Sequence, residues 1–340
     1  MYNVEYVWNK LKVCAVGRSY PPEFYSFMSD SKSRSSMEKI AQETEEDYQE
    51  LIALLQSFDV EVIRTNIPNT FTNNTLSNKI FPSAMTPRDH CAMIGNTFYL
   101  NRTQTKWNTL RGPGWPTHAP VNDQAFKQLP KFVINELADF GVTNTFECYD
   151  FDHSGLDPIK QAVQLQGNEI IYDKKIDSAM IIRLGNDLIV GTQPNESKQQ
   201  AQQRINELFP DYNCYVIDSK GHLDGTVSIV SPGLIVADRS IQLGNYFNDW
   251  KVIKVRHTNN KVQAIPLDVK HWISNAEETI IDINMLPIDQ KNIVCINNNQ
   301  IENQLINLGI NVHSVKLRHH LFWDGGVHCV TNDIHRHGNT

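Results

Sequence analysis

Residues 184–191 read LGNDLIVG, a tight turn followed directly by an apolar strand. A Gly-Asn pair suits a hairpin turn because both residues tolerate positive φ angles. The residues after the pair are mostly aliphatic or β-branched, which is typical of a buried strand. The same order of turn and strand recurs along the chain. Its five copies are residues 9–17, 94–100, 184–191, 231–237 and 290–296.

Several copies of this pattern are followed by a helix and then by another short strand. The clearest helix is predicted to begin near Ser35, which stands three residues before Glu38 as in a capping box. The apolar residues that share one face of this helix are Ala41, Tyr48, Leu51, Ile52 and Leu55. Further helices are predicted over residues 132–140, 201–209 and 301–308, each ahead of a short strand.

A unit of turn, strand, helix and strand that repeats about five times indicates α/β modules arranged around an axis. We therefore expect a single domain spanning residues 1–340. The competing interpretation is a doubly wound parallel sheet. Such a sheet with a nucleotide site would carry a G-x-G-x-x-G turn after its first strand, and the sequence contains no such motif.

Composition excludes several classes of function. A formal charge of −7 argues against a nucleic-acid partner, and the absence of any apolar run of 18 residues argues against a membrane span. The first residues do not resemble a secretory signal, and the six cysteines are scattered, so we expect free thiols in the cytoplasm. The sequence contains no H-E-x-x-H motif and no Cys/His cluster with metal-ligand spacing, so we expect no metal site.

One cysteine stands in an unusual setting. Residues 324–333 read DGGVHCVTND, in which two glycines allow a sharp bend and a close approach by a substrate just before Cys329. A thiolate nucleophile needs a base nearby. His328 is not expected to serve, because neighbouring side chains on a strand point to opposite faces. The partner of Cys329 is therefore expected from elsewhere in the sequence.

The best candidate partner is His222, with Asp224 predicted to lie on the same face of a strand. Asp89 and Asp177 occupy similar places, shortly before the turns of their own modules. Each residue taken singly could be an ordinary cap or turn former. Around an axis, however, the three carboxylates, the imidazole and Cys329 would converge. Such a pocket suits a planar cation, because carboxylates bind guanidinium through paired hydrogen bonds.

At these residues the chain resembles the L-arginine:glycine amidinotransferase family. The family is part of a guanidino-modifying superfamily that also contains arginine deiminases and dimethylarginine hydrolases. The similarity runs in order over nearly the whole chain and implies a five-bladed α/β-propeller of ββαβ modules, the pentein fold. The motifs are PRD at 87–89, DSA at 177–179 with R-x-G at 183–185, HLDGT at 222–226 with PG at 232–233, and GGVHC at 325–329.

The resemblance also implies a role for each matching residue. Cys329 matches the nucleophile, His222 the general acid and base, and Asp177 the carboxylate that pairs with the histidine. Asp89 and Asp224 match the carboxylates that grip the guanidinium group. Arg239 matches the arginine that binds a substrate carboxylate.

The implied reaction moves the amidino group of arginine to an amine acceptor, first of all glycine, and yields ornithine and guanidinoacetate. It involves small-molecule substrates and no cofactor or metal. One alternative is a deiminase-type hydrolase that uses water as acceptor. A second is a non-catalytic guanidine-binding protein, which the set of Cys329, His222 and Asp177 disfavours.

Three departures from the family pattern leave the acceptor amine open. Met180 replaces a second acid, Gly221 replaces a larger residue before the histidine, and no serine pair is evident near residues 277–279. A long loop over residues 102–121 is expected to be either a substrate wall or a surface excursion. The oligomeric state is also open, a homodimer included.

Overall fold

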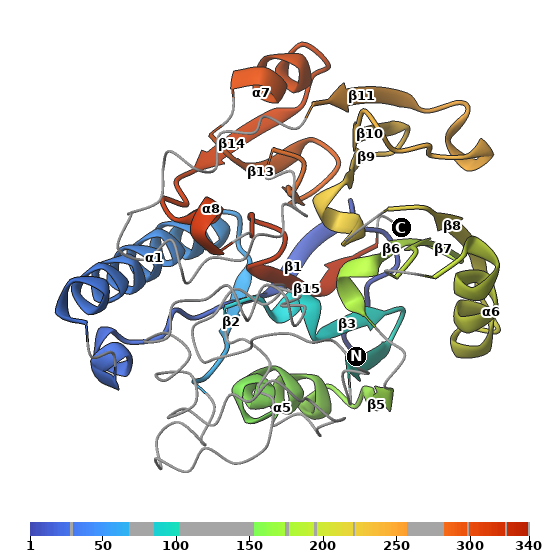
Figure 1. The fold of residues 1–340 in the computed structure, drawn as a ribbon. Coiled ribbons are helices and arrows are strands. Elements are labelled where there is room, and N and C mark those ends of the chain that lie inside the picture. Colours follow the sequence, from blue (N-terminus) through green and yellow to red (C-terminus); the bar gives the residue numbers. More distant parts are fainter. Residues whose placement is uncertain are drawn as a thin grey trace.

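Five three-stranded sheets form the framework of the protein in the computed structural model (Figure 1). The structure describes residues 1–27, 30–67, 85–101, 153–173, 177–193, 196–219, 222–256, 282–297, 299–323 and 325–338. Figure 1 shows the sheets grouped around a common centre, with α1 and α6 on opposite sides of it. The predicted α/β fold with five repeated sheets is confirmed.

All five sheets share one topology, in which an antiparallel pair is extended by a third strand parallel to its second. The first comprises β3 (Cys91–Ile94), β4 (Thr97–Asn101) and β5 (Glu169–Asp173). The second comprises β6 (Ile181–Leu184), β7 (Asp187–Gly191) and β8 (Asn213–Ile217). The third comprises β9 (Val227–Ser231), β10 (Leu234–Asp238) and β11 (Lys251–Val255). The fourth comprises β12 (Leu286–Pro287), β13 (Asn292–Ile296) and β14 (Asn311–Val315).

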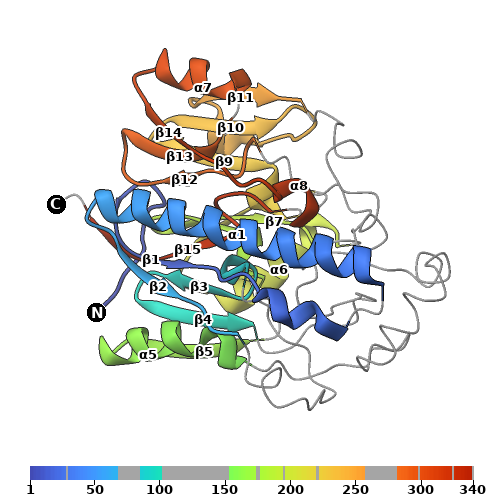
Figure 2. The ribbon, with the colours of Figure 1, turned by 90° about the vertical axis from the view of Figure 1, so that its left-hand side faces the viewer.

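The fifth sheet joins the two ends of the chain. It consists of β15 (Thr331–His337), β1 (Lys10–Val16) and β2 (Glu61–Arg64). Val16 pairs with Thr331 and Lys10 with His337 in the antiparallel register, and the ends lie on the same side in Figure 2. The turn and strand predicted at residues 9–17 therefore do not close a local hairpin. The partner strand comes from the other end of the chain, which local turn chemistry cannot indicate.

The other predicted turns are hairpins. Gly95, Gly185 and Gly233 have φ angles of 55°, 71° and 76°, a region that side-chain-bearing residues rarely adopt. In these three modules the glycine lies between the two antiparallel strands, as the sequence pattern predicts. The first strand of each of these hairpins, β3, β6 or β9, comes just after a 3-10 turn in the chain.

Helices and short 3-10 turns connect the strands. The helices are α1 (Ser31–Ser57), α5 (Asp157–Leu165), α6 (Lys198–Leu208), α7 (Asn299–Ile306) and α8 (His320–Trp323). The 3-10 turns are η1 (Pro22–Phe27), η2 (Pro87–Asp89), η3 (His153–Leu156), η4 (Ser178–Met180), η5 (Leu223–Gly225) and η6 (Asn245–Phe247). The predicted helices over 201–209 and 301–308 are α6 and α7, and residues 132–140 lie outside the described part of the chain.

Helix α1 begins one turn earlier than predicted. The side chain of Asp30 accepts a hydrogen bond from the Ser33 N–H at 2.7 Å and caps the helix. Ser35 and Glu38 consequently lie inside α1, and the capping-box prediction is wrong. The predicted apolar face is confirmed, because Ala41, Tyr48, Leu51, Ile52 and Leu55 are all buried.

The buried face of α1 packs against two sheets at once. Met37, Leu51 and Leu55 share one apolar cluster with Leu11 of β1 and Val294 of β13. Burial of this kind supplies most of the stability of an amphipathic helix. The arrangement fixes the fifth sheet next to the fourth, and in this way it positions the segments that precede β12 and β15.

Among the described residues, no helix is long and apolar enough to cross a membrane.

Candidate active site

Short turns at the inner ends of the hairpins carry the candidate residues. Asp89 ends η2, Asp177 immediately precedes η4, and His222 immediately precedes η5, which contains Asp224. Each turn leads directly into the first strand of its hairpin. Four of the candidate residues from three sheets are thereby brought to neighbouring turns.

The predicted strand geometry of His222 and Asp224 is wrong. Gly225 N–H donates to His222 O at 3.2 Å and Thr226 N–H donates to Leu223 O at 3.0 Å. These i→i+3 bonds are those of a 3-10 turn, not of an extended strand. The two side chains are therefore placed by a tight turn rather than by strand alternation.

His222 lies between two carboxylates. Its Nδ1 is 3.6 Å from Asp89 Oδ1, and its Nε2 is 3.6 Å from Asp177 Oδ2. Both distances are too long for direct hydrogen bonds but short enough for strong electrostatic attraction to a protonated imidazole. The sequence assigned only Asp177 to the histidine, whereas the structure brings Asp89 to the other side of the same ring.

Cys329 lies in a turn just before β15 and is 2% exposed. Its Sγ is 3.7 Å from Asp224 Oδ2. The Asn284 side chain also reaches it, with Nδ2 at 3.1 Å from the sulfur. Burial, followed by the charges of Asp224 and Asp89, raises the pKa of the Cys329 thiol well above its usual value. In the absence of a cation the sulfur is therefore a thiol at neutral pH.

His328 is part of this site, although strand alternation was expected to exclude it. The backbone turns here, with Thr331 N–H donating to His328 O at 3.2 Å, so the alternation rule does not apply. His328 Nδ1 lies 2.8 Å from Asp224 Oδ2. The same carboxylate oxygen thus faces both His328 and Cys329.

The charges of this pair follow from their surroundings. Burial and the positive charge of Arg88 lower the pKa of His328. Burial acts to raise the pKa of Asp224, but the hydrogen bond and charge of His328 outweigh it, so that this pKa is lowered. Asp224 is therefore ionised at neutral pH, and a neutral His328 donates to it from Nδ1. Asp224 Oδ1 is buried and has no hydrogen-bond partner within the described residues.

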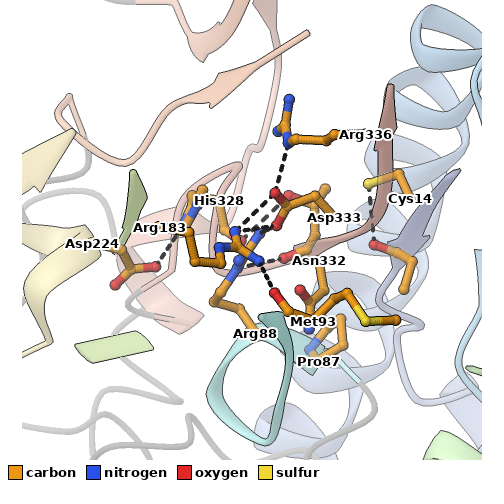
Figure 3. Close-up of polar contacts among 12 residues, drawn as sticks. Cys14, Pro87, Arg88, Met93, Arg183, Asp224, His328, Asn332, Asp333 and Arg336 are labelled. Atoms are coloured by element: carbon orange, nitrogen blue, oxygen red, sulfur yellow. Dashed lines mark hydrogen bonds and ion pairs between the residues drawn. The ribbon is translucent and has the colours of Figure 1, made fainter. Parts of the chain in front are cut away.

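A cluster of buried charges lies beside this pair and joins three of the sheets (Figure 3). Asp333, which is 1% exposed, accepts from Arg88 Nη2 at 2.7 Å, from Arg183 Nη2 at 2.7 Å and from Arg336 Nε at 2.6 Å. Burial would raise the pKa of Asp333, but the three guanidinium groups hold it well below its usual range. The cluster is therefore fully charged over a wide pH range.

The cluster connects segments that carry candidate residues. Arg88 directly precedes Asp89, Arg183 lies on the strand after Asp177, and Asp333 follows Cys329 on β15. Three cations around one anion also leave an excess of positive charge close to Asp224 (Figure 3). Such charge favours the ionised form of nearby carboxylates.

Arg239 is at the same end of its sheet but is exposed. It follows β10, where Asp238 N–H donates to Thr226 O at 2.8 Å, and its own N–H donates to Val255 O at 2.8 Å. Within the described residues, no side-chain contact joins it to the candidates above. Met180 is buried in η4. Gly221, the loop over residues 102–121 and residues 277–279 lie outside the described part of the chain.

The chain is similar in sequence to curated proteins over much of its length. It is 32% identical over 231 residues to mitochondrial glycine amidinotransferase of Gallus gallus, a match that covers 63% of this chain and 53% of that protein. The chain is therefore similar in sequence to glycine amidinotransferases, and its fold is that of the pentein amidinotransferases. The match spans only about half of the length of this relative, and 40% of the length of the glycine amidinotransferase of Danio rerio. No family model matches the chain.

Solved structures of an amidinotransferase and of a dimethylarginine hydrolase share the fold. The inosamine-phosphate amidinotransferase of Streptomyces griseus matches with a TM-score of 0.66 at 15% identity and covers 100% of this chain and 98% of that one. A dimethylarginine dimethylaminohydrolase matches with a TM-score of 0.53 at 13% identity and covers 95% and 99%. At such identities the likeness concerns the fold.

Proposed function

We propose that the protein is an amidinotransferase that moves the amidino group of arginine to an amine acceptor through a covalent amidino-Cys329 intermediate. The observation that carries the proposal is the pairing of a buried thiol with the ionised carboxylate of Asp224, with the carboxylate of Asp89 nearby. Asp224 lies 3.7 Å from the sulfur, and Asp89 faces His222 from the other side of the site. A guanidinium cation is the kind of substrate that such a site attracts and that makes the thiol reactive.

The first half-reaction follows from these charges. A guanidinium group bound between Asp89 and Asp224 offsets the negative charges that raise the pKa of Cys329. Cys329 then loses its proton to His222, and the thiolate attacks the guanidinium carbon. His222 returns that proton to the leaving nitrogen as the carbon–nitrogen bond breaks, and ornithine departs. The number of protons in the site is unchanged over the step.

The second half-reaction reverses the roles. The nitrogen of an acceptor amine attacks the amidino carbon, His222 removes the extra proton, and the carbon–sulfur bond breaks to restore the Cys329 thiol. Asp177 and Asp89 stabilise the imidazolium form of His222 in both halves, because each lies 3.6 Å from a ring nitrogen. Arg239 is proposed to bind a substrate carboxylate at the inner end of β10.

Glycine is the acceptor that we propose first, because the curated relatives are named glycine amidinotransferases. Other acceptors remain open, since the Streptomyces griseus protein is named for an inosamine phosphate. The single domain, the cytoplasmic location and the oligomeric state stay predictions from the sequence.

The test is to incubate the protein with arginine alone and measure its intact mass. The expected result is an added amidino group on Cys329, with one ornithine released per site. Cys329→Ser should form no adduct, because a serine hydroxyl offers no comparable anion. An adduct in the serine variant would refute the role of Cys329.

Adding glycine then separates transferase from hydrolase. A transferase yields guanidinoacetate and ornithine. The alternative, a deiminase-type hydrolase, yields citrulline whatever amine is present. Arginine binding without any product would identify a non-catalytic binding protein and refute both the transferase and the hydrolase hypotheses.

A further inference from the structure

The fourth sheet supplies a site residue that the sequence did not suggest. Asn284 stands two residues before β12, in the same register as Asp89 before β3 and Cys329 before β15. It is 0% exposed. With this residue, all five modules contribute a side chain at the inner end of their first strand.

The side chain of Asn284 makes three hydrogen bonds that connect two of the site turns. Its Oδ1 accepts from Cys329 N–H at 3.0 Å. Its Nδ2 donates to Asp224 O at 3.1 Å and to Cys329 Sγ at 3.1 Å. These partners determine the orientation of the amide. A flipped amide would set Oδ1 against a carbonyl oxygen and Nδ2 against an N–H, so an N–H group must face the sulfur.

Gly326, the second of the two glycines before the cysteine, makes room for this contact. A Cβ atom on Gly326 would lie 2.7 Å from both Cβ and Oδ1 of Asn284. The sequence suggested a close approach by a substrate at the glycines, whereas at Gly326 the side chain of Asn284 approaches the backbone. The missing side chain of Gly326 is therefore what allows Asn284 to reach Cys329.

The chemistry of the site explains why an uncharged donor is suited to this position. The surroundings of Cys329 oppose a negative sulfur, because the site is buried and two carboxylates face it. A lysine or arginine next to the sulfur would stabilise the thiolate but would also repel a cationic substrate. An amide N–H stabilises the negative sulfur and leaves the charge of the pocket unchanged.

We propose that Asn284 is a catalytic residue whose side-chain N–H stabilises the Cys329 thiolate and whose carbonyl oxygen holds the Cys329 backbone in place. The catalytic role of Asn284 rests on the proposed function, but the experiment that tests its contact with Cys329 does not require the protein to turn over arginine. The contact between Nδ2 and Sγ acts on the thiolate whether or not a substrate is turned over.

The test is the rate at which iodoacetamide alkylates Cys329 in the full-length protein without substrate, measured over a pH series from the peptide that carries Cys329. A hydrogen bond to a charged group changes the thiolate population by about 10- to 150-fold, and the greater nucleophilicity of a more basic thiolate offsets about half of this on a logarithmic scale. Asn284→Ala should therefore react about three- to twelve-fold more slowly at pH 8, with its profile displaced to higher pH.

A second variant separates this role from a purely structural one. Asn284→Asp keeps the shape and the acceptor for Cys329 N–H but replaces the donor with a carboxylate. It should react more slowly than Asn284→Ala, whereas a purely structural residue would tolerate aspartate better than alanine. A wild-type profile in Asn284→Asp would overturn the inference even if the alanine variant does not fold, as judged by circular dichroism.

Asn332 offers a matched control. It is 0% exposed and donates from Nδ2 to Cys91 Sγ at 3.2 Å. Asn332→Ala should leave the alkylation profile of Cys329 in place. A folded Asn284→Ala with the wild-type profile would overturn the inference and leave the proposed function intact. If the Asn284→Ala profile is displaced but the wild-type protein forms no arginine adduct, the role of Asn284 stands and the proposed function is refuted.

Discussion

Replacing Asp224 by asparagine removes one negative charge beside Cys329 and keeps the shape of the side chain. Asp224 Oδ2 faces Cys329 Sγ at 3.7 Å and accepts from His328 Nδ1 at 2.8 Å. An amide oxygen can still accept from His328, so the local hydrogen bonding survives. The substitution therefore tests the charge of Asp224 more than its packing.

The single change should move two observable rates in opposite directions. Two negative charges 3.7 Å apart repel by about 4 kcal/mol at an effective dielectric constant of about 20. Removing this repulsion lowers the pKa of Cys329, and iodoacetamide should alkylate the free enzyme faster at neutral pH. Breaking a buried charge pair with the substrate costs about 2–5 kcal/mol, so kcat/KM for arginine should fall about 30- to 5,000-fold.

The assay measures Cys329 alkylation over a pH series and arginine turnover on the same preparation. Asp187→Asn is a suitable control, because Asp187 begins β7 next to the Gly185 turn and bonds to Asn213 and Tyr246 rather than to the site. An unchanged or slower alkylation of Asp224→Asn would refute the electrostatic role of Asp224. Unchanged arginine kinetics would refute its proposed contact with the guanidinium group.

Two more predictions follow from the charged groups. Asp333→Asn leaves three buried guanidinium groups without their anion and should lower the free energy of unfolding by about 3–5 kcal/mol in a urea titration. The pKa of Asp333 is lower in the folded than in the unfolded protein. The contribution of Asp333 to the free energy of unfolding is therefore fully present above the ordinary carboxyl pKa and is lost as the pH falls below that value. A wild-type protein that lost this stability near neutral pH would contradict the assignment. If Arg239 binds the acceptor carboxylate, Arg239→Ala should reduce transfer to glycine more than transfer to ethanolamine. An equal loss with both acceptors, accompanied by slower adduct formation, would assign it to arginine instead.

Much of the fold could be predicted from local patterns in the sequence. The glycine turns and the strands after them are local features, since the φ angles at Gly95, Gly185 and Gly233 depend on their own residues. The apolar face of α1 was predictable for the same reason. The start of α1 was not, because a serine and an aspartate both cap helices and the choice of Asp30 over Ser35 depends on how the preceding chain enters.

The candidate site could be predicted in residue identity but not in geometry. Cys329, His222 and the three aspartates stand out by their place in successive modules. The presence of His328 in the site was missed because strand alternation was assumed where the chain makes a turn. The register of the modules was a signal that could have revealed Asn284, which stands two residues before its strand like Asp89 and Cys329.

Local patterns in the sequence predicted the repeated module and the order of the candidate residues along it. Tertiary structure decided which atoms meet. The pairing of β15 with β1 closes the fifth sheet from opposite ends of the chain, and it sets Cys329 against Asn284 and Asp224. It also gathers Arg88, Arg183 and Arg336 around Asp333. Contacts between residues so far apart in sequence depend on how whole sheets pack against one another, and no local pattern of residues encodes that packing.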